Sequence, residues 1–124
     1  MTAAVTSLMG VGMPAAQASA LGENLRTATA AGTAQGGSSP TIYSSDFAIL
    51  TTSAGQTAVT LDSGFPVGED CTVYNNTATA ALLFPPTGCT IDNASANASV
   101  AIAQNRGRVV RRVSATAFLT FYGA

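Results

Sequence analysis

The chain contains no histidine, no lysine and no tryptophan, and only 9% of its 124 residues are charged. Without histidine it lacks the side chain that most often acts as a general acid or base near neutral pH, and without lysine it lacks the usual Schiff-base nucleophile. Glu69 and Asp70 are the only acids that are neighbours in the sequence. Neighbouring residues on a strand point to opposite faces, so these carboxylates do not converge on one substrate. We therefore predict no catalytic residues and a protein that is not an enzyme.

Metal and cofactor sites also lack their usual residues. Cys71 and Cys89 are the only cysteines, and without histidine they cannot complete the four-ligand set of structural zinc. Gly10 to Ala15 match the G-x-G-x-x-A pattern of dinucleotide-binding loops, but the strand, the crossover helix and the later acid that the pattern requires are missing. We expect no metal and no cofactor. For the two cysteines, the sequence favours buried thiols and leaves a disulfide open.

The scarcity of charge leaves an unusually apolar chain. Its mean hydropathy is +0.31, although glycine, proline, serine or threonine interrupts every apolar run before it reaches the ~18–20 residues of a membrane span. The excess apolar surface must then be covered by other protein, which predicts an oligomer or a larger assembly and no membrane partner. The net charge of −1 provides no basic field, so we also expect no nucleic-acid partner.

The composition changes near residue 40. Residues 1–39 are rich in Ala, Gly, Thr and Ser with few bulky side chains, and we interpret them as an N-terminal extended arm with one short helix and a linker. Pro14 suits the first turn of that helix and Gly22 the position after its end. Met13 and Leu21 would lie on its thin apolar stripe, which makes them candidate contacts with a partner.

Residues 40–124 form the expected β domain, with turn signals every 8–12 residues, the spacing of an all-β sandwich or barrel. No long helix is available to cross between parallel strands, so we predict an antiparallel β-sandwich or barrel of about eight short strands. The expected strands are Asp46–Thr52, Ala58–Leu61, Cys71–Asn75, Ala80–Phe84, Cys89–Asp92, Ser99–Ala103, Arg108–Ser114 and Ala117–Tyr122.

The one concentration of charge is "RGRVVRR", residues 106–112. Strand alternation predicts Arg108, Val110 and Arg112 on one face and Val109, Arg111 and Val113 on the other. Arginine on both faces favours a subunit boundary, where a guanidinium binds a carboxylate at two points. A solvated edge strand and a phosphate-binding strand are the alternatives, although no aromatic residues interleave to stack bases. The candidate contacts with a partner are Arg106, Arg108, Arg111 and Arg112.

The order of strands and corners resembles a known class of protein. The stretch "FAILTT…TAVTL…GEDCTVYNNTATAALLFPPTGCTIDNASANASVAI", with the lead-in "SLMGVGMPAAQASALG", is similar to the small Ala/Gly-rich β modules among the structural proteins of tailed bacteriophages. The resemblance covers about residues 5–122. It implies a non-enzymatic virion protein of the capsid decoration or cement type, or of the head-fibre type.

In the decoration interpretation, the resemblance implies a homotrimer on the capsid exterior. The protein would be made in the host cytoplasm, and its partners would be its own copies and the phage major capsid protein. The alternative is a phage tail or fibre β module that binds a host-surface glycan through Tyr74, Phe84, Phe118 or Tyr122. A third hypothesis, a secreted adhesin, requires a Cys71–Cys89 disulfide.

Overall fold

The computed structural model describes residues 24–122, and this part of the chain is all-β, without a helix. The expected short helix, Met13 and Leu21 lie outside the described residues. The ten strands are β1 (Asn24–Thr29), β2 (Thr41–Ile42), β3 (Asp46–Thr51), β4 (Ala58–Leu61), β5 (Asp70–Asn75), β6 (Ala81–Phe84), β7 (Thr90–Ile91), β8 (Val100–Ile102), β9 (Gly107–Ser114) and β10 (Ala117–Tyr122).

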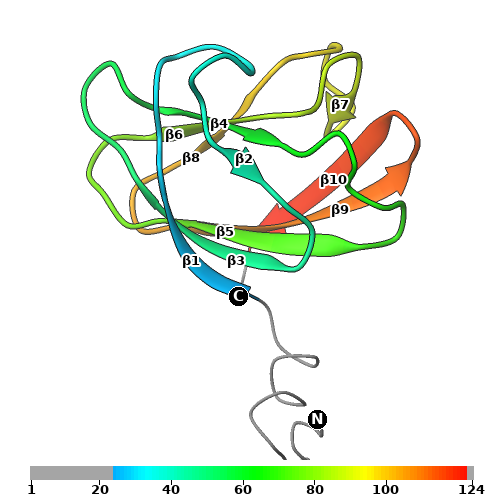
Figure 1. The fold of residues 1–124 in the computed structure, drawn as a ribbon, viewed down its shortest axis with the longest axis horizontal. Coiled ribbons are helices and arrows are strands. Elements are labelled where there is room, and N and C mark those ends of the chain that lie inside the picture. Colours follow the sequence, from blue (N-terminus) through cyan, green and yellow to red (C-terminus); the bar gives the residue numbers. More distant parts are fainter. Residues whose placement is uncertain (1–23, 123–124) are drawn as a thin grey trace, which may run out of the picture.

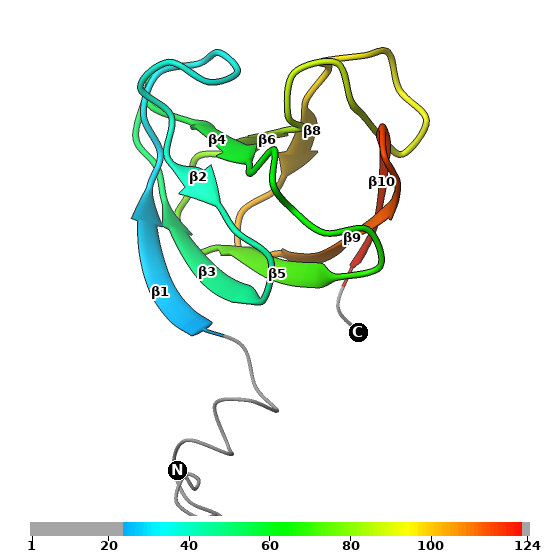
Figure 2. The same cartoon turned by 45° about the vertical axis from the view of Figure 1, so that its right-hand side comes forward.

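The strands form two sheets that face each other. The larger sheet has the order β1-β3-β5-β9-β10-β7 and the smaller one the order β2-β4-β6-β8. Figures 1 and 2 show the smaller sheet above the larger one, with the core between them. From β1 to β6 the chain alternates between the two sheets, so successive pairs of strands stack like the turns of a coil.

The expectation of antiparallel sheets is wrong for most of the described strand pairs. Five of the eight pairings are parallel and three are antiparallel. Parallel neighbours need a crossover connection, which is usually a helix. Here a strand of the opposite sheet does that work, because the chain leaves β1, forms β2 in the smaller sheet and returns to form β3 beside β1. The sheets are therefore mixed.

The predicted strand positions are confirmed more closely than the predicted pairing. Each of the eight expected strands corresponds to an observed one, and Ala58–Leu61 and Ala117–Tyr122 have the same limits in both. The sequence analysis missed β1 and β2. Strand β1 lies within the expected arm, yet it pairs with β3 along its whole length, so β structure begins before the expected domain boundary at residue 40.

The core lies between the inner faces of the sheets. Burial alternates strictly along β3 and β5, as expected for strands with one face in the core. Phe65, from the loop after β4, meets Phe118 of β10 edge to face, with ring centroids 5.4 Å apart. Cys71 and Cys89 are both buried as thiols. The favoured interpretation of the cysteines thus agrees with the structure.

The asparagine-rich corners have a backbone explanation. Asn93, Asn97 and Asn105 have φ values of 62°, 68° and 56°, in the left-handed region that asparagine tolerates better than most residues. These three residues turn the chain before β8 and between β8 and β9. The corners therefore serve the course of the backbone and give no reason to assign them a glycosylation or binding role.

Candidate functional site

Arg108 of β9 points between the sheets and is engaged inside the molecule. Its Nη1 donates to Thr120 Oγ1 over 2.5 Å and lies 3.5 Å from Asp92 Oδ2, while its Nε donates to the Ala101 carbonyl over 3.3 Å. Its side chain is only 13% exposed. Asp92 also accepts from the backbone N and hydroxyl of Thr120, at 2.7 and 2.6 Å. This network joins β9 to β10, to the end of β7 and to β8.

Arg112, four residues further along the strand and on the same face, is also used internally. Its guanidinium lies over the Phe118 ring, 5.3 Å from the centroid, and within 4.0 Å of Cys89 Sγ. Its nitrogens donate to backbone carbonyls on both sides of it: Ser63 (3.1 Å), Phe65 (2.6 Å), Ser114 (3.2 Å) and Ala115. Arg112 therefore fastens the loop between β4 and β5 to the turn between β9 and β10.

The other two arginines of the cluster are exposed. Arg111 points outward from β9 and its Nη2 lies 2.7 Å from Asp70 Oδ2 of β5, with the two side chains 52% and 35% exposed. Arg106 is exposed in the turn before β9. The predicted alternation is thus correct, but the structure divides the cluster into an inner pair, Arg108 and Arg112, and an outer pair. A partner contact through any of them stays a prediction.

A fifth arginine, which the sequence analysis did not single out, lies on β1 at the edge of the larger sheet. Arg26 Nη2 of β1 donates to the Thr41 carbonyl over 2.6 Å, and its Nε lies 3.2 Å from Asp46 Oδ2, within ion-pair distance but without hydrogen-bond geometry. Its guanidinium carbon is 5.7 Å from the centroid of the Tyr43 ring. Arg26 thus has a structural role, because it is the positively charged partner of the buried Asp46.

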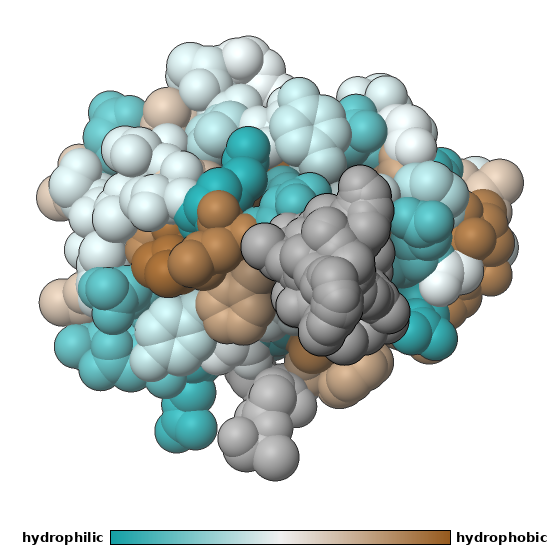
Figure 3. All heavy atoms as spheres, turned by 60° about the horizontal axis from the view of Figure 1, so that its bottom comes forward, coloured by the Kyte–Doolittle hydropathy of each residue, from teal (hydrophilic) through white to brown (hydrophobic). Residues whose placement is uncertain are grey.

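The outer face of the larger sheet carries a row of apolar side chains. The register aligns Leu25 with Phe47, Phe47 with Thr72, Thr72 with Val109, and Val109 with Phe121. Leu25 and Phe121, at the two ends of this row, are 71% and 56% exposed. Figure 3 shows hydrophobic side chains gathered on this side of the molecule. Four of these five side chains are apolar and the middle one is a threonine, and so extended an apolar row on an exposed sheet surface makes this face a candidate contact surface.

Further residues extend the row on the same face. Ile49 lies beside Tyr74. Leu119, which is 40% exposed, lies beside Arg111, and Asp70 lies on the other side of Arg111. We call these side chains together the outer face: Leu25, Phe47, Ile49, Asp70, Thr72, Tyr74, Val109, Arg111, Leu119 and Phe121.

A signal for the outer face was present in the sequence. Strand β3, "DFAILT", is apolar at consecutive positions rather than alternate ones. Such continuous runs are typical of parallel strands that are covered on both faces. In the structure β3 has parallel neighbours on both sides, but protein covers only its inner face among the described residues. The run was noted as a strand, but its two-sided apolarity was not used.

The aromatic residues proposed for a glycan contact do not form one surface. Phe118 is 0% exposed and packs in the core, so it cannot stack on a sugar. Tyr74 lies on the outer face, whereas Phe84 belongs to β6 in the smaller sheet. The side chain of Tyr122 lies outside the described residues. The glycan set predicted from the sequence is therefore not assembled.

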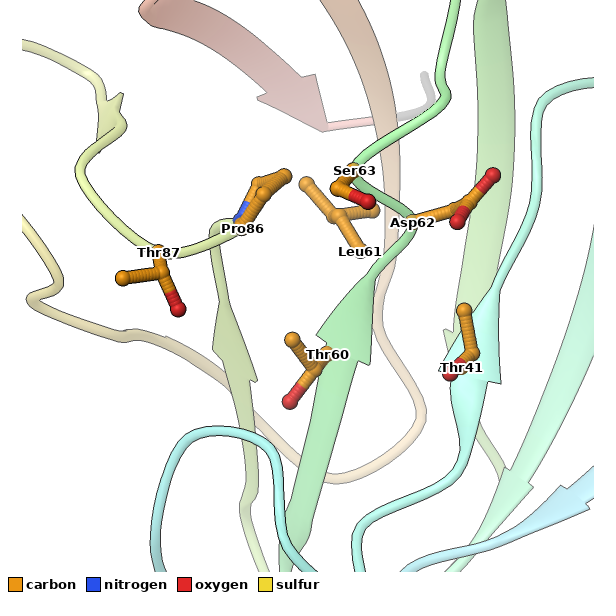
Figure 4. Close-up of a pocket in the computed structure, with 7 residues that line it drawn as sticks. All are labelled: Thr41, Thr60, Leu61, Asp62, Ser63, Pro86 and Thr87. Atoms are coloured by element: carbon orange, nitrogen blue, oxygen red, sulfur yellow. The ribbon is translucent and has the colours of Figure 1, made fainter.

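An open hollow of about 440 Å³ lies beside β2 and β4, as Figure 4 shows. Asp62 is the single charged residue on its wall, and the Thr60 hydroxyl is already engaged, with Ser39 Oγ at 2.7 Å and the Gly36 N–H at 3.0 Å. A lone carboxylate without a second titratable group provides no acid–base pair. The lining residues are Thr41, Thr60, Leu61, Asp62, Ser63, Pro86 and Thr87.

Within residues 24–122, no three cysteine or acidic side chains approach closely enough to hold a metal ion. In the same range no helix has the length and apolarity to cross a membrane. A scan against protein-family models found no match for the chain, and a search of curated proteins found none either. The outer face is therefore the feature of the described residues that most clearly points to a function.

Proposed function

We propose that this protein is a non-enzymatic structural component of a bacteriophage virion, a capsid decoration or cement protein. It stabilises the phage head by binding the outer capsid lattice and its own copies, and it acts through buried surface rather than through chemistry. The single observation that carries the proposal is the outer face, a largely apolar row across five strands whose two ends, Leu25 and Phe121, are exposed in the described part of the chain. The resemblance of the sequence to phage β modules supplies the type of particle.

The use of charge inside the molecule supports the same function. Arg26 is paired with Asp46 and Arg108 with Asp92, while Arg112 is bonded to backbone carbonyls. These ionic groups hold strands and loops together instead of forming a reactive or ligand-binding cluster. What the surface offers to other molecules is a broad sheet with little charge, which suits a lasting contact with protein.

The architecture suits a rigid spacer on a particle. The two facing sheets support a sandwich-like module in which stacked turns share one core. We propose that the chain occupies the capsid exterior in this form, as a homotrimer and with the major capsid protein as its partner. No nucleic-acid or membrane contact is part of this function.

The copy number and position on the particle test the proposal. Purified particles from the source of the chain should contain it in the head fraction, at a molar ratio comparable to that of the major capsid protein, as measured by quantitative mass spectrometry. Particles that lack the protein should bind it when it is added back and should then release their DNA at a higher temperature. Recovery in the tail fraction at a small fraction of that ratio would contradict a decoration role and favour the fibre module.

A further inference from the structure

We propose that the outer face is a homotypic interface, on which a second copy of this chain packs face to face about a two-fold axis. The inference deepens the proposed function and rests on it only in part, because it assigns the outer face to self-association and leaves attachment to the particle to other surfaces. The occupant is a second copy because the outer face is complementary to itself in the positions of its apolar side chains and of its charges.

The apolar part of the outer face is suited to a like surface. Leu25 and Phe121 stand at opposite ends of a row that runs across β1, β3, β5, β9 and β10. A two-fold axis that runs along the strands between β5 and β9 places Phe121 of each copy over Phe47 of the other. The central residues of the row, Thr72 and its neighbours, are already half-buried and form the middle of the contact.

The charges of the outer face are self-complementary as well. Asp70 and Arg111 lie side by side on it, 2.7 Å apart, one acid and one base. A partner with a surface of a single sign would be repelled by one of the two. A second copy turned through 180° instead brings its Arg111 to this Asp70 and its Asp70 to this Arg111, which makes an alternating group of four charges. Partial exclusion of water strengthens such charge-assisted pairs.

The parallel pairing of β3 with its neighbours is a further reason to expect that the outer face is covered. Strand β3 has parallel neighbours on both sides and exposes Phe47 and Ile49 outward while Ala48 and Leu50 point to the core. Parallel sheets occur mostly with both faces covered. A second copy covers the outer face of β3 with β10 of its own sheet. Since the contact is two-fold, a homotrimer of the kind that the resemblance implies would have to use a separate surface.

The first test is the oligomeric state of the purified full-length chain, measured without particles by sedimentation velocity and light scattering over a range of concentrations. We expect a dimer that dissociates on dilution. Phe121→Ser should raise the dimer dissociation constant by at least about tenfold, the effect of losing one well-covered apolar side chain. Val67→Ser is the matched control: Val67 is 58% exposed but lies in the loop between β4 and β5, and its loss should leave the dissociation constant unchanged.

The second test uses the two charges. Asp70→Arg and Arg111→Asp each put two like charges on the outer face of both copies, so each variant alone should be mainly monomeric. An equimolar mixture of the two variants should form a heterodimer, because a face with two arginines then meets a face with two aspartates. The double variant Asp70→Arg/Arg111→Asp should dimerise like the parent. Circular dichroism melting curves check that each variant is folded, and the exposed position of both side chains predicts that they are.

A chain that stays monomeric at all concentrations overturns the inference, and coverage of the outer face by residues 1–23 of the same chain would give that result. A dimer whose dissociation constant is unchanged by Phe121→Ser and by both charge reversals also overturns it, because another surface then makes the contact. Binding to particles is measured separately. A monomeric chain that occupies the capsid refutes the homotypic interface alone, whereas a dimer that never binds a head refutes the proposed function alone.

Discussion

The side-chain amide nitrogen of Asn75 donates to the main-chain carbonyl of Ile102 over 2.9 Å and thereby joins the ends of the two sheets. Asn75 ends β5 in the larger sheet, and Ile102 ends β8 in the smaller one. The same nitrogen donates to the Thr79 carbonyl over 2.8 Å, and Asn75 Oδ1 accepts from the backbone N and hydroxyl of Thr77, at 3.1 and 3.0 Å. The side chain is fully buried, and both of its donors and its acceptor oxygen are used.

Replacement of Asn75 by alanine should destabilise the fold strongly. It removes the side-chain partner of the Ile102 carbonyl and of the Thr77 N–H, whereas the Thr79 carbonyl keeps the Thr52 hydroxyl, which donates to it over 2.9 Å. Unsatisfied buried groups cost about 1–3 kcal/mol each when water cannot reach them. We expect a loss of about 3 kcal/mol in the free energy of unfolding, because some of these groups lie near the surface. Urea denaturation followed by circular dichroism measures the change.

Asn76→Ala is the matched control for this substitution. Asn76 is the next residue and is exposed, so its replacement should change the unfolding free energy by less than about 0.5 kcal/mol. Equal effects of the two substitutions would show that the buried amide network does not join the sheets.

The arginines provide a second contrast, between Arg112 and Arg111. Arg112→Lys keeps the positive charge, but an ammonium group has three donors on one atom and cannot reach carbonyls of two separate segments as a planar guanidinium does. We expect Arg112→Lys to lower the free energy of unfolding by about 1–3 kcal/mol. Arg111→Lys, which alters an exposed ion pair, should cost less than about 1 kcal/mol. Thermal and urea unfolding of the two variants side by side would show which arginine is structural.

This contrast changes what the arginines can test. The sequence alone makes Arg108 a candidate contact with a partner. The structure places Arg108 in a network with Asp92 and Thr120, mostly out of water, so its loss should also destabilise the chain itself. Arg111, on the outer face, is the residue whose substitution separates a partner contact from folding.

Strand positions could be predicted from the sequence because their signals are local. Runs of apolar and β-branched residues and the turn residues that bound them mark a strand locally, and this was enough for β4 and β10. The pairing partner and its direction are not local properties. Nothing within Asp46–Thr51 shows that its neighbours are β1 and β5, since that depends on how the chain returns through the opposite sheet. The sequence analysis missed β1 because Ala28 is its only fully buried residue. So small a side chain gives little alternation between apolar and polar positions along the strand.

The candidate site was only partly accessible for a similar reason. Alternation in residues 106–112 correctly separated Arg108 and Arg112 from Arg111, but it did not show which face is turned inward. Charged residues are expected outside, and Arg112 is held inside because carbonyls of the β4–β5 loop and of the β9–β10 turn surround its guanidinium. Those segments are distant in sequence. The sequence of β3 signals only its own part of the outer face, and the whole outer face appears when the register aligns side chains from five strands.

Two truncations test where the β structure begins. Removal of residues 1–39 takes away β1 and with it Ala28 and Ala30 of the core and the partner of Asp46, and it exposes the edge of β3. Removal of residues 1–22 leaves every described strand intact. We expect the longer deletion to lower the melting temperature markedly and to promote aggregation through the newly open edge, and the shorter one to have a much smaller effect. Equal stability of the two proteins, measured by scanning calorimetry, would contradict a structural role for β1.

The last prediction concerns the two thiols. Cys71 is fully buried on β5, and Cys89, before β7, is 5% exposed and lies beside the guanidinium of Arg112 and the Ala115 carbonyl. A thiol must be reached by the reagent to react, so we expect neither group to be labelled quickly in the folded protein. In denaturant without a reducing agent, labelling should count both thiols, and a reducing agent should leave the melting temperature unchanged. If denaturation released no reactive thiol until a reductant was added, the two cysteines would be joined and the secreted-adhesin hypothesis would gain the support that the structure withholds.

Rapid labelling of Cys89 alone in the native state would instead show that the loop fastened by Arg112 opens. Arg112→Lys should then increase that labelling rate further, because it removes the hydrogen bonds that hold the loop in place.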